Sequence, residues 1–295
     1  MNTGYVALIG CPNAGKSTLL NHLIGQKLSI TSRKPQTTRH RIHGIKTAEW
    51  GQAIYVDTPG LHSGEKRAIN RYLNRTADSV LLGVDIVVLL LDSLHWNAEN
   101  EWLLGKLKAV DCPVILAVNK IDTFADKDVM LPFLDEVSRK FPFAEIVPIS
   151  ALRGTNLAQL EECIAKLLPE GEPIYPPDQI TDRPERFFAS EIIREKLIRA
   201  LGQEVPHAIT VQIEQFQEEG NLTRIHAVIW VERDGQKAIV IGKNGAVLKK
   251  VGQRARLDLE TFLERKVYLD LWVKVKKGWS DNEKALLSLG YTDSV

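Results

Sequence analysis

The sequence predicts an α/β domain with a mainly parallel sheet, followed by a smaller α+β domain. The length of 295 residues is long for one domain. As far as residue 168, short apolar runs alternate with amphipathic stretches of helical length. A proline-rich segment at 169–184 follows, and the order of elements then changes. With 44% hydrophobic and 25% charged residues, the composition is that of a globular protein with a sizeable core.

Residues 1–168 contain five short apolar runs that we predict to be strands. The runs are apolar throughout rather than alternating, as in strands that are covered on both faces. They are YVALIG (5–10), AIYVD (53–57), DIVVLLLD (85–92), PVILAVN (113–119) and AEIVPIS (144–150). Helices are predicted at 15–25, 65–82, 97–110, 129–141 and 156–168. This order indicates a mainly parallel sheet with helices on both sides.

The segment 169–184 contains five prolines, a density that predicts an extended linker. The second domain, at 185–277, is predicted to contain a helix, two strands, a short strand at 238–241, a long helix and a final strand. The final strand alternates apolar and polar residues from Val267 onward, which indicates one buried face. Residues 278–295 are expected to form a tail with a short helix.

The charge of the chain is unevenly distributed. Residues 236–277 carry 11 Lys and Arg against 4 Asp and Glu, a net of +7 in a chain whose total is +1, so the remainder carries −6. This distribution predicts a polyanionic partner confined to one region.

The cysteines and the apolar runs indicate a cytoplasmic protein. Cys11, Cys112 and Cys163 are odd in number and form no CxxC pair, which favours a reducing compartment and no disulfide partner. The chain opens into a predicted strand, which leaves no room for a secretory signal. The longest apolar runs are too short to span a bilayer.

The stretch GCPNAGKS, residues 10–17, fits the pattern GxxxxGK[ST] and joins a predicted strand to a predicted helix, as that pattern requires. Backbone N–H groups and the helix dipole would bind phosphates, Lys16 would add charge at the β and γ positions, and Ser17 can ligate Mg²⁺. The pattern predicts a nucleoside triphosphate but does not choose the base. The predicted contacts are Asn13, Ala14, Gly15, Lys16, Ser17 and Thr18.

The stretch NKID predicts that the base is guanine. The Asp122 carboxylate is placed to accept hydrogen bonds from N1–H and the 2-amino group, which adenine cannot offer. Asn119 is expected to bond N7, and the aliphatic stem of Lys120 to cover the ring. In SAL, which begins at Ser150, the Ala151 N–H is expected to bond the guanine O6.

The remaining parts of the predicted nucleotide site are DTPG and KPQTTRHR. Asp57 would hold Mg²⁺ through water, and the Gly60 N–H would sense the γ-phosphate. The second stretch would bring a threonine hydroxyl to Mg²⁺, with Thr38 preferred and Thr37 the alternate. The predicted metal residues are thus Ser17, Thr38 and Asp57, and the predicted catalytic residues are Lys16, Thr38 and Gly60.

Hydrolysis is expected to be slow. GTPases of the Ras type carry a glutamine after DxxG that orients the attacking water, and here that residue is Leu61, which cannot form a hydrogen bond through its side chain. Slow turnover favours a switch over a metabolic enzyme. Asn13 matches the asparagine with which some GTPases hold a K⁺ ion near the phosphates, so K⁺ is a candidate cofactor beside GTP, GDP and Mg²⁺.

The stretch GKNG, residues 242–245, is the second glycine-built loop. It lies in the most basic part of the chain before a basic amphipathic helix, as in a KH module, where such a loop clamps single-stranded nucleic acid by its backbone. The apolar run at 238–241 would carry unstacked bases, and Arg256 is a further candidate. The predicted RNA-binding residues are Ile241, Gly242, Lys243, Asn244, Gly245, Lys249, Lys250 and Arg254.

With both loops in place, the chain resembles the bacterial Era GTPases, which join a Ras-like GTPase domain to a type II KH domain. The resemblance covers nearly the whole chain and rests on GCPNAGKST, KPQTTRHRI, DTPGLH, NKID, SAL, ITDR, ASEIIREKL, VERDGQKAIVIGKNG and DLWVKVKKGW. It implies binding near the 3′ end of small-subunit (16S) ribosomal RNA, a role in 30S ribosomal subunit biogenesis, and peripheral association with the cytoplasmic face of the inner membrane.

Two other functions are compatible with these motifs. One is an RNA chaperone whose nucleotide site only stabilises the fold. The other is a membrane-associated signalling GTPase with its basic patch on anionic lipid, although lipid attraction needs charge and not glycine. We expect a monomer, and the sequence itself leaves the oligomeric state open.

The base assignment predicts the behaviour of one variant. Asp122→Asn replaces a carboxylate that accepts the guanine N1–H with an amide that can donate to xanthine, so nucleotide preference is expected to shift from guanine toward xanthine. Competition between GDP and xanthosine diphosphate for the purified protein measures the shift. An unchanged preference would refute the assignment.

Overall fold

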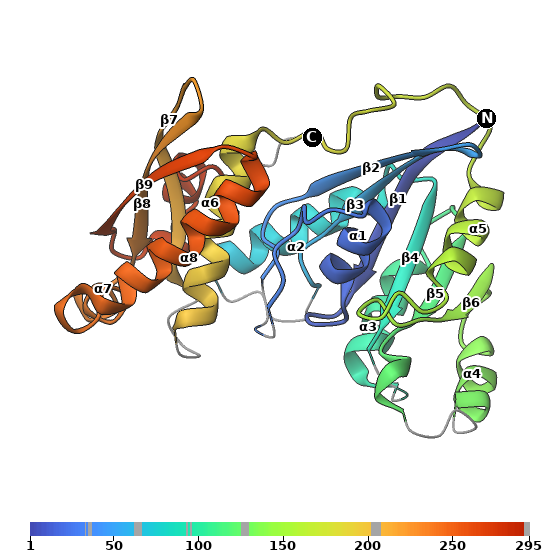
Figure 1. Ribbon diagram of the computed structural model, residues 1–295. Coiled ribbons are helices and arrows are strands. Elements are labelled where there is room, and N and C mark those ends of the chain that lie inside the picture. Colours follow the sequence, from blue (N-terminus) through green and yellow to red (C-terminus); the bar gives the residue numbers. More distant parts are fainter. Residues whose placement is uncertain are drawn as a thin grey trace. The chain divides into compact units, whose positions relative to one another are not determined.

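The computed structural model describes residues 1–32, 34, 37–61, 67–92, 94, 96–124, 130–201 and 208–291. By its internal contacts the chain divides into two compact units, whose elements Figure 1 labels. The first consists mainly of residues 1–65 and 73–182, and the second of residues 66–72 and 183–294.

The first unit contains a six-stranded sheet in the order β2-β3-β1-β4-β5-β6. All neighbouring strands are parallel except β2, which runs antiparallel to β3. The strands are β1 (Asn2–Gly10), β2 (Ile42–Ala48), β3 (Gly51–Asp57), β4 (Ile86–Leu91), β5 (Val114–Val118) and β6 (Glu145–Pro148). The five strands predicted from the sequence are all present, and the edge strand β2 was not predicted.

Helices pack on this sheet around a buried apolar core. They are α1 (Lys16–Ile24), α2 (Ala68–Leu81), α3 (Ala98–Leu107), α4 (Met130–Ser138) and α5 (Leu157–Leu167), with a short 3₁₀ turn, η1, at Ile121–Thr123. Leu103 of α3 and Val137 of α4 share one core cluster with Leu89 of β4 and Leu116 of β5. The strand residues that point the other way, such as Val88, are equally buried. The predicted parallel α/β fold is confirmed.

The predicted linker contains no helix or strand before residue 185, but residues 169–182 are anchored to the first unit. Gln52 of β3 is fully buried, and its Oε1 accepts the N–H groups of Ile174 and Tyr175, both at 2.9 Å. Further along, the Ile45 N–H of β2 donates to the Ile180 carbonyl at 2.8 Å. These bonds hold the segment along the edge strand β2 and its neighbour β3.

The second unit contains a three-stranded sheet, β7-β8-β9, in which β7 and β8 are antiparallel and β8 and β9 parallel. Its elements are α6 (Glu185–Ala200), β7 (Thr210–Glu219), β8 (Leu222–Val231), α7 (Asp234–Ile241), η3 (Lys243–Gly245), α8 (Ala246–Leu263), β9 (Lys266–Val275), η4 (Trp279–Asp281) and α9 (Glu283–Ser288). Val251 and Leu259 of α8 and Val267 and Val273 of β9 lie in one core cluster. The predicted one-sided burial of both elements is confirmed.

The strand predicted at 238–241 is wrong, because these residues form the last turn of helix α7. The helix is capped by Gln236, whose side-chain oxygen accepts the N–H groups of Glu232 at 2.9 Å and Arg233 at 3.1 Å. Val240 is buried, whereas Ile239 is 51% exposed. The apolar strand that was expected to carry unstacked bases is therefore absent from this position, and a helix leads into the GKNG turn.

Residues 278–291 pack into the second unit rather than forming a separate tail. Trp279 is completely buried, and its indole N–H donates to the Ala208 carbonyl at 3.2 Å. The Tyr291 ring stacks on Trp279 with a centroid distance of 5.9 Å, and its hydroxyl donates to Thr210 at 3.0 Å. Within the described ranges, no helix combines the length and the apolar character that crossing a membrane requires.

The burial of Trp279 predicts a large stability effect. Trp279→Ala should lower the free energy of unfolding of the second unit by about 3–5 kcal/mol, because the substitution leaves a cavity and removes a hydrogen bond. Trp272→Ala is the matched control, because Trp272 is 60% exposed, and it should change stability by roughly 0.5 kcal/mol or less. Urea unfolding followed by circular dichroism measures both variants, and equal effects would contradict the packing described.

Candidate functional site

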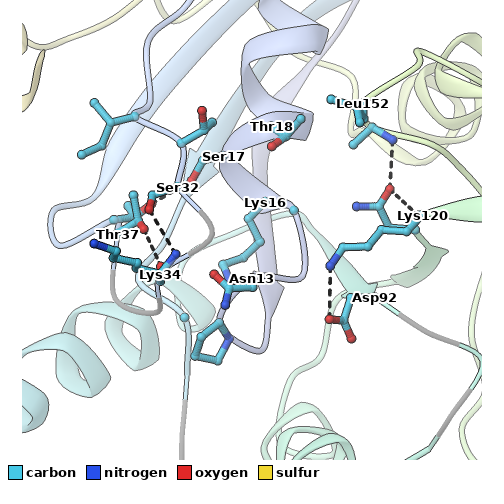
Figure 2. A pocket seen from close by; sticks show the side chains of 18 of the residues that line it. Asn13, Lys16, Ser17, Thr18, Ser32, Lys34, Thr37, Asp92, Lys120 and Leu152 are labelled. Carbon is cyan, nitrogen blue, oxygen red and sulfur yellow. Dashed lines mark hydrogen bonds and ion pairs between the residues drawn. The ribbon is translucent and has the colours of Figure 1, made fainter. Parts of the chain in front are cut away.

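The loops that follow β1, β3, β4, β5 and β6, together with the segment between α1 and β2, line a pocket of about 630 Å³ in the first unit (Figure 2). Parallel strands bring their carboxyl ends to one edge of the sheet, which is where open α/β sheets bind ligands. The predicted residues that line the pocket are Asn13, Gly15, Lys16, Ser17, Thr18, Thr38, Gly60, Asn119, Lys120, Asp122 and Ala151. Ala14, Asp57 and Ser150 are not among the lining residues and are buried.

The loop before α1 is shaped for close approach of an anion. Gly15, the N-cap of α1, has a φ of +103°, and a Cβ there would lie 2.2 Å from the Asn119 side-chain nitrogen. Asn13 also has a positive φ, of +66°. The N–H groups of the first helical turn have no partner within a helix, so they are donors for a phosphate.

Lys16 is the charged side chain of this loop. It is 4% exposed, and its ammonium donates to the carbonyls of Gly10 at 2.8 Å and Cys11 at 3.0 Å. Burial lowers the pKa of Lys16, while the nearby Asp57 carboxylate acts in the opposite direction. A phosphate beside this ammonium would offset the desolvation and favour the charged form of Lys16.

The Asn119 side chain joins the phosphate loop to the two base loops. It is 2% exposed; its nitrogen donates to the Ala14 carbonyl at 2.8 Å, and its oxygen accepts the N–H groups of Lys120 at 2.8 Å and Ala151 at 2.9 Å. One hydrogen of the amide nitrogen remains for a base nitrogen. The Ala151 N–H, expected to bond guanine O6, is directed at Asn119 in this structure.

Two residues of the predicted base loop, Lys120 and Asp122, are held by side chains from other loops. The Ser150 hydroxyl donates to one oxygen of Asp122 at 2.5 Å, which fixes that carboxylate in the pocket. Lys120, in a left-handed conformation with a φ of +67°, forms an ion pair with Asp92 at 3.3 Å, as Figure 2 shows. The Lys120 stem is thereby held at the pocket wall. Asp92 was not predicted from the sequence.

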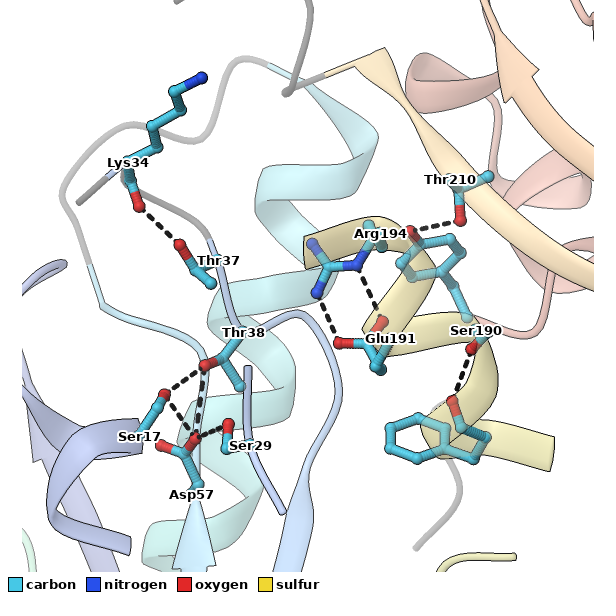
Figure 3. A network of polar contacts seen from close by, with 12 residues as sticks. Ser17, Ser29, Lys34, Thr37, Thr38, Asp57, Ser190, Glu191, Arg194 and Thr210 are labelled. Atoms are coloured by element: carbon cyan, nitrogen blue, oxygen red, sulfur yellow. Dashed lines mark hydrogen bonds and ion pairs between the residues drawn. The ribbon is translucent and has the colours of Figure 1, made fainter. Parts of the chain in front are cut away.

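The predicted metal residues converge on one buried carboxylate (Figure 3). Asp57 is fully buried, and its Oδ2 lies 2.8 Å from the Ser17 hydroxyl and 3.3 Å from that of Thr38, while these two hydroxyls are 2.7 Å apart. The Thr37 hydroxyl donates instead to the Lys34 carbonyl at 2.7 Å. The structure therefore brings Thr38, and not its alternate, to the cluster.

This cluster fits Mg²⁺, which takes oxygen ligands at protein sites. The second oxygen of Asp57, Oδ1, is buried and has no hydrogen-bond partner among the described residues. Burial raises the pKa of Asp57, and the hydroxyl hydrogen bonds and Lys16 oppose that rise. A cation close to this carboxylate would supply the missing partner and favour its charged form.

The Ser29 hydroxyl is a fourth member of this cluster, and the sequence motifs did not indicate it. It donates to Asp57 Oδ2 at 2.7 Å, and Ser29 is fully buried.

Gly60 lies against the phosphate loop, since a Cβ there would be 2.9 Å from both the Cα and the nitrogen of Pro12. Gly60 also lines the pocket, and its contact with the γ-phosphate stays a prediction. The next residue, Leu61, is 1% exposed and packs into the core cluster of the sheet. Its side chain is thus part of the core, in agreement with the expectation that it does not orient a water.

In the second unit, the GKNG turn joins α7 to α8 with an unusual backbone. Gly242, Asn244 and Gly245 have φ values of +73°, +52° and +76°. A Cβ on Gly242 would lie 2.4 Å from a methyl carbon of Val247, whereas a Cβ on Gly245 would meet nothing within 4 Å. Ile241 and the two glycines are half-buried. The remaining predicted RNA-binding residues are exposed: Lys243, Asn244, Lys249, Lys250 and Arg254.

The chain matches two family models. One, described as 50S ribosome-binding GTPase, matches residues 5–120, and one for the KH domain matches residues 204–280. The chain is 57% identical over 290 residues to GTPase Era of Ectopseudomonas mendocina (strain ymp), covering 98% of this chain and 97% of that protein. It is 55% identical to GTPase Era of Haemophilus influenzae (strain PittGG), covering 98% and 96%.

Two crystal structures are similar over almost the whole chain. One is a single-residue variant of Aquifex aeolicus Era bound to GDP.AlF4⁻, with a TM-score of 0.96, 42% identity, and coverage of 99% of this chain and 100% of that chain. The other is Era in complex with MgGDPNP and nucleotides 1506–1542 of 16S ribosomal RNA, with a TM-score of 0.96, 42% identity and 99% coverage of each chain.

Because the Asn119 side chain lies against Gly15, adding a side chain at Gly15 is predicted to lower the affinity for nucleotide. Gly15→Ala places a methyl against Asn119 and should weaken GDP binding roughly 10- to 100-fold, because it disrupts a buried hydrogen bond of the loop. Gly25→Ala is the matched control, because Gly25 also has a positive φ (+76°) but has open space beside its Cα. Fluorescence titration with labelled GDP measures both variants. Similar losses in the two variants would contradict the role assigned to Asn119.

Proposed function

The chain belongs to the Era family of GTPases, and from that premise we propose that it is an RNA-binding switch in 30S ribosomal subunit biogenesis. As a member of this family it is a GTPase, which hydrolyses GTP to GDP and phosphate. The observation that carries the proposal is the likeness, over 99% of the chain, to Era in complex with MgGDPNP and 16S ribosomal RNA nucleotides. Among the described residues, the pocket and the GKNG turn suit those ligands.

The proposed nucleotide site is the pocket of the first unit. Backbone N–H groups of residues 13–18 would bind the phosphates with Lys16, and Asp122 would select guanine while Ser150 holds its carboxylate. Gly60 would present its N–H to the γ-phosphate. The whole assignment comprises Asn13, Ala14, Gly15, Lys16, Ser17, Thr18, Asp57, Gly60, Asn119, Lys120, Asp122, Ser150 and Ala151.

Ser17, Thr38 and Asp57 would hold Mg²⁺, with Asp57 acting through water. The bound ion supplies positive charge that neutralises the phosphates during transfer. Asn13 lines the pocket at the phosphate loop, which supports the proposal that a K⁺ ion adds further charge there. The supporting observation for Thr38 is the convergence of its hydroxyl with that of Ser17 on one buried carboxylate.

The proposed hydrolysis is slow without a partner. Because Leu61 is part of the core, the residue that orients water in Ras-type GTPases has no counterpart at this position. A long-lived GTP state suits a switch, in which the state of the pocket determines whether RNA is held. Lys16, Thr38 and Gly60 are the proposed catalytic residues, since each is placed at the phosphates.

The proposed RNA site is the GKNG turn together with the start of α8. Successive left-handed residues at Asn244 and Gly245 leave the backbone open to a phosphate, and the exposed Lys249, Lys250 and Arg254 add salt-sensitive attraction. Ile241 and Lys243 complete the assignment. The proposed partner is the 3′ end of small-subunit ribosomal RNA within the 30S subunit.

We propose that the nucleotide domain comprises residues 1–168, the linker 169–184 and the KH domain 185–277, with residues 278–291 packed onto the KH domain. The proposed location is the cytoplasm. Association with the inner membrane would be peripheral, with the basic residues of α8 attracted to anionic lipid. The proposed functional form is a monomer.

The RNA site predicts the effect of one added charge. Gly245→Asp places a carboxylate at a turn that would touch phosphate, so affinity for single-stranded 3′-terminal ribosomal RNA should fall at least about 10-fold while GDP affinity stays unchanged. Gly245 is the suitable glycine, because a side chain there meets open space, whereas one on Gly242 would strike Val247.

Gly220→Asp is the control for this variant. Gly220 lies in the same unit, has a φ of +58° and also has open space beside its Cα, so the control adds the same charge in the same backbone conformation away from the turn. Fluorescence anisotropy with labelled RNA measures both variants. Unchanged RNA affinity in Gly245→Asp, or an equal loss in Gly220→Asp, would remove the GKNG turn from the RNA site.

A further inference from the structure

The Asp57 carboxylate is held asymmetrically. Its Oδ2 receives the Ser29 hydroxyl at 2.7 Å in addition to those of Ser17 and Thr38. Its Oδ1 is buried and has no hydrogen-bond partner among the described residues. A carboxylate with one oxygen that accepts several hydroxyl groups is restricted in its rotation about its bond to the chain.

Ser29 differs from the other two hydroxyl groups in its surroundings. Ser17 and Thr38 line the pocket, whereas Ser29 is completely buried and is not among the described residues that line it. A hydroxyl shielded from the pocket cannot ligate an ion bound there. When an ion binds the hydroxyls of Ser17 and Thr38, Ser29 can therefore still donate to Asp57.

The Ser29 backbone is itself fixed from helix α1. The Asn21 side-chain nitrogen donates to the Ser29 carbonyl at 2.7 Å, and its oxygen accepts the N–H groups of Leu28 at 2.9 Å and Ser29 at 2.8 Å. Asn21 lies one turn along the same helix that begins with Lys16 and Ser17. The helix that supplies a metal-binding hydroxyl therefore also places the Ser29 donor, which needs no adjustment when an ion binds.

We propose that Ser29 is a positioning residue for magnesium, which holds the Asp57 carboxylate in place beside the hydroxyls of Ser17 and Thr38. The proposal rests on the magnesium site of the proposed function. Removing the hydroxyl frees the carboxylate to rotate and leaves it with one donor fewer. Outer-shell changes of this kind weaken metal binding and are offset by more metal, which separates them from a general loss of structure.

The test is the Mg²⁺ dependence of nucleotide retention. Dissociation of fluorescent GDP from the full chain is measured over a series of Mg²⁺ concentrations buffered with EDTA. Ser29→Ala should raise the Mg²⁺ concentration for half-maximal retention roughly 10-fold, and saturating Mg²⁺ should restore retention close to that of the parent. Ser29→Thr, which keeps a hydroxyl, should lie near the parent.

Ser138→Ala is the matched control. Ser138 is exposed at the end of helix α4 and is not among the described residues that line the pocket, and its hydroxyl donates to the Asp135 carbonyl at 2.8 Å, so the variant removes a hydroxyl of the same unit that does not bond Asp57. Its Mg²⁺ midpoint should equal that of the parent. Should Ser29→Ala fail to fold, Ser29→Cys keeps a similar shape with a weak donor and carries the same expectation of a raised midpoint.

The outcomes separate this inference from the proposed function. A Ser29→Ala midpoint equal to that of the parent, or a defect that saturating Mg²⁺ does not restore, would overturn the role of Ser29 while the magnesium site stands. A parent protein that retains GDP equally with and without Mg²⁺ would overturn the magnesium site itself.

Discussion

Both candidate sites depend on backbone that lies too close to its neighbours to carry a Cβ atom. At Gly15 the missing side chain leaves room for the Asn119 amide, and at Gly242 it leaves room for Val247. Each glycine has a positive φ, which L-residues with side chains adopt at a cost. In the first unit this space is filled by the Asn119 side chain, whose hydrogen bonds join the phosphate loop to the base loops. In the second it is filled by an apolar contact that seats α8 directly after the turn.

The first site is further organised around one buried carboxylate. Asp57 ends β3, Ser17 lies in the first turn of α1, and Ser29 and Thr38 come from the segment between α1 and β2, so three parts of the chain meet at one oxygen atom. A buried carboxylate is costly unless it is hydrogen-bonded or paired with a cation. This cost links binding of the ion to the position of the Thr38 segment, and such a link is what a nucleotide-dependent switch requires.

Several features followed from the sequence because chemistry restricts the residue type. A lysine and a serine after a glycine at the start of a helix, and Asp122 after a buried strand, lie where their motifs place them, and the structure brings them to one pocket. Ser29 carries no motif, because its contact with Asp57 arises from tertiary folding across 28 residues. Asp92 was missed for the same reason, since its partner Lys120 lies in the loop that follows the neighbouring strand β5.

The errors in secondary structure have local causes. Four apolar residues at 238–241 are too few to distinguish a strand from a helix by periodicity. The Gln236 side chain caps the N-terminus of α7 and thereby favours the helix. Strand β2 was missed because Ile42–Ala48 is a short edge strand with a glycine in it and no regular alternation.

The proposed switch is tested most directly by the affinity of the protein for single-stranded 3′-terminal ribosomal RNA, measured by anisotropy once with GDP bound and once with a non-hydrolysable GTP analogue bound. We predict that the GTP-analogue form binds the RNA at least about 10-fold more tightly, which corresponds to a coupling free energy of about 1.4 kcal/mol. Equal affinities in the two forms would contradict the switch.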